Sequence, residues 1–171
     1  MNDGESGPRH PVIVVAVEPG QPDAVLLHAA ALARDLGVEL VCAHVDMSRY
    51  PVEERVDGSV SSAPFDPDLP EFGEGTFDPT LEEHIRQVLA DSPVRYSLRG
   101  LAGDPARALG HLADAVHARL IVVGTHRPGL RRGVRDFFNG SVAVHLAHRQ
   151  HRPVLVVPLA PVTDDGELPW Q

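Results

Sequence analysis

The chain has 171 residues, of which 43% are hydrophobic, and its formal net charge at pH 7 is −9. This length suits one compact domain with a substantial buried core. The negative charge argues against nonspecific binding to nucleic acid or to an anionic membrane, because the overall field repels polyanions. The single cysteine, Cys42, excludes an intrachain disulfide framework, and the absence of lysine excludes a P-loop lysine.

The two ends of the chain differ in composition from the middle. Residues 1–11 are polar and predict a disordered lead without the apolar segment of a signal peptide. No apolar run approaches the length of a membrane-spanning helix, so we expect a cytoplasmic protein with no membrane partner. Residues 159–171 are acidic and contain prolines, and they predict a mobile tail. Residues 12–158 between them predict one domain.

The first third of that domain predicts a strand, a helix and a second strand. Residues 12–17 (VIVVAV) form a continuous apolar run, which is typical of a central parallel strand. The alanine- and leucine-rich residues 24–36 predict a helix that is ended by the following glycine. Residues 39–45 (ELVCAHV) predict the second strand, in which Cys42 and His44 are expected in the core.

Residues 46–78 differ in composition from the residues before them. They are rich in proline, acidic residues, serine and glycine and show no sustained periodicity, so we predict a long and partly disordered surface loop. Apolar residues between 81 and 89 then recur at helical spacing and predict an amphipathic helix. Residues 94–101 alternate between apolar and polar side chains, which predicts a less buried strand near a sheet edge.

The second half of the domain continues the alternation of helices and strands. Residues 103–105 (GDP) combine a turn, an acidic N-cap and a proline at the first helical position. Residues 120–123 (LIVV) predict another buried strand, residues 142–147 the apolar face of a helix, and residues 153–158 (PVLVVP) a final strand. The resulting order predicts an α/β fold with an open five-stranded parallel sheet and helices on both faces.

The most informative stretch runs from Leu120 to Ser141, where a strand, a glycine-rich basic loop and the start of a helix follow one another. Glycines let a backbone approach a ligand closely, and a helix N-terminus offers free N–H groups and partial positive charge to an anion. The loops at 18–22 and 124–140 follow the most apolar strands and should face each other across a crevice at the carboxyl ends of the strands. We therefore expect a phosphate-bearing ligand there. The candidate residues in the loop are Gly124, Arg127, Gly129, Arg131, Gly140 and Ser141.

Other polar residues predict structural roles. His145, His148 and His151 are spaced i, i+3 and i+6, which does not bring all three to one helix face, so a metal site is not expected. Asp104 is expected to cap its helix. No Ser-His-Asp, paired-carboxylate or Gly-Lys-Ser arrangement is present, and we therefore predict binding rather than catalysis.

Several of these segments, taken together and in order, resemble the universal stress protein family. They are VIVVAV, the AHV at the end of the second strand, GDPARAL, ARLIVVGTHR and GSVAVHLAHRQHRPVLVVP. The resemblance runs from about Val12 to Pro158, with the acidic segment 46–78 unmatched. It implies a Rossmann-like, adenine nucleotide alpha hydrolase-like fold with strand order 3-2-1-4-5. It also implies a homodimer, and we expect the edge strand 153–158 to pair with its copy across a two-fold axis.

One subset of this family binds ATP through the pattern Gly-x2-Gly-x9-Gly-(Ser/Thr) after the fourth strand. Gly124 matches the first glycine, and Gly140 with Ser141 matches the end of the pattern. The second glycine would fall at Arg127, but the available one is Gly129, and the loop is three residues longer than the pattern.

The resemblance further implies the remaining contacts of a bound nucleotide. The backbone of Val45 would meet adenine, and Glu18, where the family usually has aspartate, would lie on the ribose side. The loop glycines and Ser141 would hold the phosphates with Arg127 or Arg131, and Mg²⁺ would accompany the nucleotide. The expected function is a stress-response regulator that binds ATP or AMP. Two alternatives stay open: a nucleotide-independent dimeric interaction module, favoured by the lengthened loop, and a slow nucleotide hydrolase.

Overall fold

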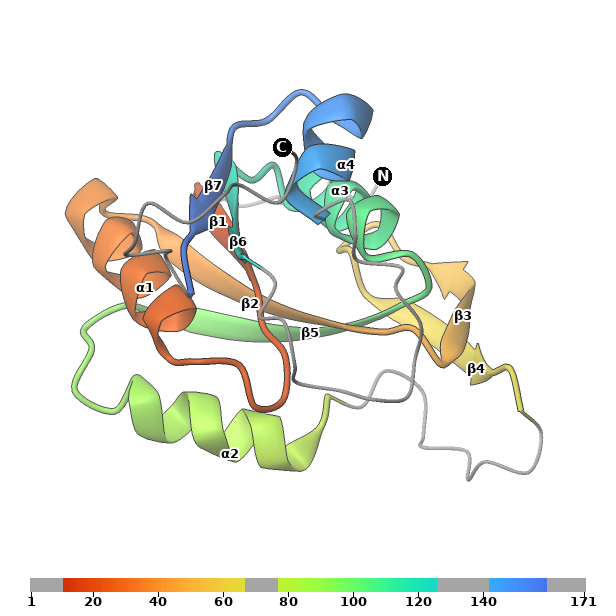
Figure 1. Ribbon diagram of the computed structural model, residues 1–171, viewed down its shortest axis with the longest axis horizontal. Coiled ribbons are helices and arrows are strands. Elements are labelled where there is room, and N and C mark those ends of the chain that lie inside the picture. Colours follow the sequence, from red (N-terminus) through yellow and green to blue (C-terminus); the bar gives the residue numbers. More distant parts are fainter. Residues whose placement is uncertain (1–10, 67–76, 126–141, 160–171) are drawn as a thin grey trace, which may run out of the picture.

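The computed structural model describes residues 11–66, 77–125 and 142–159. The helices and strands, in chain order, are β1 (Val12–Ala16), α1 (Ala24–Leu36), β2 (Glu39–Asp46), β3 (Arg49–Glu54), β4 (Val60–Pro64), α2 (Pro79–Val88), β5 (Tyr96–Ala102), α3 (Pro105–Ala115), β6 (Leu120–Gly124), α4 (Val142–Arg149) and β7 (Val154–Val157). Five of the strands form a parallel sheet in the order β5-β2-β1-β6-β7 (Figure 1). Numbered among themselves, these strands have the order 3-2-1-4-5, which confirms the predicted α/β fold.

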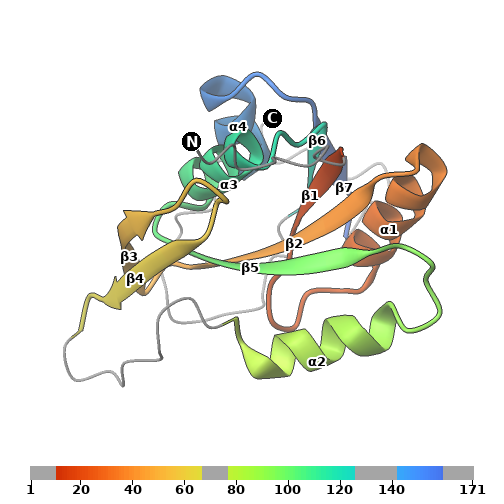
Figure 2. The same ribbon diagram turned by 180° about the vertical axis from the view of Figure 1, so that it is seen from behind.

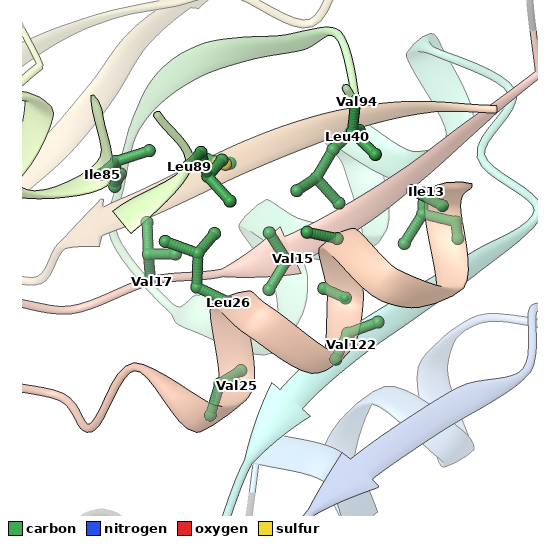
Figure 3. Packing of buried hydrophobic residues seen from close by; sticks show 14 of the residues in the cluster. Ile13, Val15, Val17, Val25, Leu26, Leu40, Ile85, Leu89, Val94 and Val122 are labelled. Atoms are coloured by element: carbon green, nitrogen blue, oxygen red, sulfur yellow. The ribbon is translucent and has the colours of Figure 1, made fainter. Parts of the chain in front are cut away.

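Helices cover both faces of this sheet, and each face has its own apolar cluster. On one face, α1 and α2 pack against Ile13 and Val15 of β1. On the other, α3 and α4 pack against Val12 and Val14. Figure 3 shows the first cluster, with Val122 of β6 beside the β1 side chains. Strand β1 is apolar at every position because both of its faces are buried, as in other parallel sheets.

Short sequence signals set the helix ends. The carboxylate of Asp104 accepts a hydrogen bond of 2.8 Å from the backbone N–H of Arg107, and Pro105 occupies the first turn, so the predicted cap of α3 is confirmed. Helix α1 ends at Gly37, whose φ of 62° lies in the left-handed region that favours glycine. The ends of the helices determine where the loops between helices and strands begin.

The segment 46–78 departs from the prediction. Strands β3 and β4 form an antiparallel hairpin, so the expectation of an irregular loop was wrong for residues 49–64. The hairpin lies beside α3 and near the end of β5 (Figure 2), where Val60 joins the second apolar cluster. A register shift between Pro51 and Glu53 interrupts the alternation that would have signalled a strand. The Asp57-Gly58 pair in the turn was the signal that could have revealed the hairpin.

Strands β5 and β7 are the two edges of the sheet, which confirms the edge position expected for residues 94–101. On β7, Leu155 and Val156 are each 41% exposed. The predicted lead at 1–11 and tail at 159–171 lie almost wholly outside the described residues, as do residues 67–76 and 126–141. Pro11 is described, and its carbonyl accepts a hydrogen bond from the N–H of Glu39.

Candidate functional site

The candidate site lies where the central strands β1, β2 and β6 end. Gly124 closes β6 and packs tightly against the loop that follows β1. A Cβ atom at Gly124 would lie 2.9 Å from Val25 Cγ2, 3.0 Å from Gln21 Nε2 and 3.0 Å from Leu159 Cδ1. Any larger residue would therefore push these neighbours apart. The structure thus places Gly124 against Gln21 of the segment between β1 and α1, a neighbour that sequence reasoning had not singled out.

Val45 presents an unpaired peptide edge at this end of the sheet. The odd-numbered residues of β2 direct their backbone groups toward β1, since the N–H of Glu39 donates to Pro11 and the carbonyl of Ala43 accepts from Val17. Val45 follows this alternation and points the same way, but the pairing of β1 with β2 extends only to Ala16 and Ala43. Among the described residues, the N–H and C=O of Val45 therefore have no hydrogen-bond partner on this side.

His44 contacts the carbonyl of the residue that follows β1. Its ring Nδ1 lies 3.1 Å from the carbonyl oxygen of Val17, the group to which the N–H of Val45 would donate if the pairing of β1 with β2 continued by one step. Because a carbonyl can only accept, Nδ1 must carry a proton in this contact. The ring also lies edge-on to Phe77, with centroids 6.2 Å apart. His44 is only half-buried, so its expected place in the core was wrong, although its hydrogen bond agrees with the prediction of a satisfied histidine.

Glu18 lies at the same end of the sheet, shortly after β1. Its side chain is exposed, and its carbonyl accepts a hydrogen bond of 3.1 Å from the N–H of Gln21, which forms a turn directly after β1. Further along this loop, the Asp23 carboxylate lies 2.7 Å from His84 Nε2, so α2 holds the start of α1 in place. The Glu18 carboxylate itself makes no hydrogen bond to another described residue, and it is accessible to a ligand.

The remaining predicted phosphate contacts lie outside the described residues. They are Arg127, Gly129, Arg131, Gly140 and Ser141. The described segment before them ends at Thr125, whose N–H donates to the carbonyl of Val157 and whose hydroxyl accepts from the N–H of Leu159 at 2.8 Å. The start of the loop is therefore tied to the residues that follow β7.

The described residues contain no group of three or more His, Cys, Asp or Glu side chains arranged to hold a metal. His145, His148 and His151 are all exposed. Cys42 is fully buried, as expected for a core residue, and this burial raises the pKa of its thiol to about 12. A thiol with such a pKa is a poor nucleophile near neutral pH. Within the described ranges, no helix has the length and apolarity needed to span a membrane.

Solved structures resemble this chain over most of its length. A universal stress protein from Archaeoglobus fulgidus in complex with dAMP is 22% identical; the match covers 86% of this chain and 98% of that one, with a TM-score of 0.54. A universal stress protein in complex with cAMP is also 22% identical, with 90% and 100% covered and a TM-score of 0.56. A universal stress protein family protein from Arabidopsis thaliana with AMP bound is 17% identical, with 86% and 91% covered and a TM-score of 0.50.

The sequence comparisons agree with this likeness in fold. No curated protein matches the chain at a significant level. The family model described as the universal stress protein family matches residues 11–158, a range that spans β1 to β7 and includes every residue of the candidate site. By its sequence and its strand order, the chain belongs to the universal stress protein family.

Proposed function

We propose that this protein binds an adenine nucleotide, AMP or ATP, in the crevice where β1, β2 and β6 end. The unpaired peptide edge of Val45 is the observation that carries this proposal. Adenine has a ring nitrogen that accepts and a neighbouring amino group that donates, and these match a free N–H and a free C=O. A ligand that pairs with both groups removes the cost of leaving them unpaired away from water.

The sugar and the phosphates would extend from the base toward the loop after β6. We expect the exposed carboxylate of Glu18 to contact the ribose hydroxyls on the β1 side. Glycines in the loop allow close approach of the backbone, and arginines offer charge-assisted hydrogen bonds to phosphate oxygens. The phosphate-binding set that we propose is Gly124, Gly129, Gly140 and Ser141, with Arg127 or Arg131. Mg²⁺ would accompany a triphosphate.

The similar structures support the choice of an adenine ligand. Those from Archaeoglobus fulgidus and Arabidopsis thaliana contain dAMP and AMP, and a third contains cAMP. These ligands share adenine and a single phosphate. We therefore expect the base and the first phosphate to contribute most of the affinity, and the protein to act as a binding regulator of a cytoplasmic stress response rather than as an enzyme.

Dimerisation is part of the proposal. Among the described residues, strand β7 is an edge whose outer row of backbone groups has no strand beside it, and Leu155 and Val156 are large exposed apolar residues on it. Pairing of residues 153–158 with the same strand of a second copy would cover both features. Light scattering coupled to size-exclusion chromatography should find a dimer, and Val156→Asp should shift it toward the monomer. A wild-type monomer at micromolar concentration would contradict this part.

Calorimetric titration with a panel of adenosine, AMP, ATP and inorganic tripolyphosphate tests nucleotide binding. AMP and ATP should bind, adenosine should bind more weakly, and tripolyphosphate without a base should not replace them. At about one hundred times its dissociation constant, a ligand should add about 2.7 kcal/mol to the free energy of unfolding. No binding and no thermal stabilisation at millimolar AMP and ATP would refute the proposal.

The lengthened loop after β6 favours a second candidate, a dimeric interaction module that works without nucleotide. A titration that detects no nucleotide binding by a protein that still forms a dimer would support this second candidate. A slow hydrolase would instead convert ATP to ADP over hours in a reaction that Ser141→Ala abolishes. Slow background hydrolysis that survives Ser141→Ala would exclude that activity.

A further inference from the structure

The β3–β4 hairpin is joined directly to the strand end that carries Val45. Met47 and Ser48 separate β2 from β3. The Asp46 carboxylate accepts hydrogen bonds from the backbone N–H of Ser48 at 2.8 Å and from its hydroxyl at 2.6 Å. The carbonyl of Ser48 accepts from the N–H of Phe65, just beyond the far end of β4. The end of β2 and the hairpin are therefore joined by hydrogen bonds as well as by the chain.

The turn of this hairpin docks on α3. Gly58 has a φ of +80°, and a Cβ atom there would lie 2.6 Å from Leu112 Cδ1 and 3.3 Å from Ala115 Cβ. At the same contact, Glu54 Oε2 lies 3.0 Å from His111 Nδ1. Figure 2 shows the hairpin beside α3, on the face of the sheet that α3 covers. Docking thus depends on the absence of a side chain at Gly58, with one exposed contact between Glu54 and His111 beside it.

Two hollows lie beside the close contact of Gly58 with α3. A hollow of about 40 Å³ lies between the hairpin and α3, and another of about 230 Å³ lies between the turn and β5. Asp57 and Arg99 line the second hollow but form no ion pair with each other. The carboxylate of Asp57 instead accepts hydrogen bonds from the hydroxyl and N–H of Ser59, and these bonds lower its pKa. Because hollows beside a contact reduce the dispersion energy that holds it, we expect the hairpin to open at a lower free energy than the sheet.

We propose that the hairpin is a brace for the nucleotide site. When it is docked on α3, it holds the end of β2 where the Val45 peptide edge faces the crevice; when it is released, that edge moves and the nucleotide is bound more weakly. This inference rests on the proposed function and concerns how nucleotide binding is regulated. Because coupling between two sites is reciprocal, a bound nucleotide stabilises the docked hairpin by the same factor.

Gly58→Ala tests the brace, with Gly37→Ala as its matched control. Both changes add a methyl group to a glycine with positive φ, but Gly37 has no atom within 4 Å of the new position. Hydrogen exchange should quicken in residues 49–64 of the Gly58 variant only. Exchange should also quicken at the N–H of Gly103, which donates to the carbonyl of Asp46 at 3.1 Å and so reports on the end of β2. The affinity for AMP should fall by at least about fivefold, while Gly37→Ala keeps the wild-type affinity.

Three results would overturn the brace. One is a Gly58 variant whose hairpin exchanges no faster than that of the wild type. The second is a released hairpin in a variant whose hydrogen exchange at Gly103, measured without ligand, is unchanged. The third is a released hairpin in a variant whose affinity for AMP is unchanged. Absence of AMP binding to the wild-type protein would refute the proposed function instead. The hydrogen exchange rate at Gly103 would still show whether the hairpin braces β2. If Gly58→Ala does not fold, His111→Ala replaces it, with smaller changes in the same directions.

Discussion

Replacing Gly124 by alanine should destabilise the protein, although the change adds only one methyl group. That group would lie 2.9 Å from Val25 Cγ2 and 3.0 Å from atoms of Gln21 and Leu159. Gln21 and Leu159 can yield, but Val25 is fully buried, and its β-branched side chain is restricted to few rotamers in a helix. Overpacking of this kind costs about 1–3 kcal/mol. In a chain of this size, each kcal/mol lowers the melting temperature by about 2–4 °C.

Gly110→Ala is the matched control for this prediction. Gly110 lies within α3, and the nearest atoms to its added Cβ, both from Gln150, are 3.8 Å away, an ordinary contact. Alanine is favoured over glycine inside a helix by about 0.5–1 kcal/mol, so this variant should be more stable than the wild type. Urea denaturation should therefore give shifts of opposite sign for the two variants. Equal stability of Gly124→Ala and the wild-type protein would refute the close packing described at the end of β6.

The remaining predictions concern three side chains. Cys42 should resist alkylation at pH 8 in the native protein and react fully in denaturant, because burial raises its thiol pKa to about 12; rapid native labelling would contradict its burial. Asp104→Ala should lower the free energy of unfolding by about 1 kcal/mol through loss of the α3 cap, while Asp104→Asn, which can still cap, should lose less; identical losses would show that the cap contributes nothing. Arg152→Met should cost about 1–3 kcal/mol in urea denaturation, because the carbonyl of Ala118 loses its 2.7 Å hydrogen bond and Asp114 loses its ion pair; wild-type stability would contradict this.

The sheet could be predicted from the sequence because its elements carry local signals. The runs at 12–16 and 120–124 are continuously apolar because they are covered on both faces, and Asp104 with Pro105 specifies the start of α3. The hairpin could not be predicted in the same way, because β4 gains its place by packing Val60 against the second apolar cluster. Such a contact between distant parts of the chain leaves no periodic pattern in the segment itself.

The position of Gly124 could be predicted from the sequence, but its surroundings could not. A strand followed by a glycine-rich basic loop predicts Gly124 at the end of a central strand, and the structure places it there, next to the loop after β1. The free peptide edge of Val45 depends on where β1 ends relative to β2, and the contact of His44 with the carbonyl of Val17 depends on the direction of the His44 side chain. Strand register and side-chain direction are tertiary properties, so neither could be read from residue types.

Titration of the ¹⁵N-labelled protein with AMP, followed by amide NMR shifts, tests the central claim most directly. If an adenine nucleotide pairs with the free edge of β2, the amide resonances of Val45, Gln21 and Gly124 should shift together with one dissociation constant. The amide resonance of Gly37, at the far end of α1, should not shift. Absence of shifts at millimolar AMP, or shifts confined to residues away from the ends of β1, β2 and β6, would contradict the account.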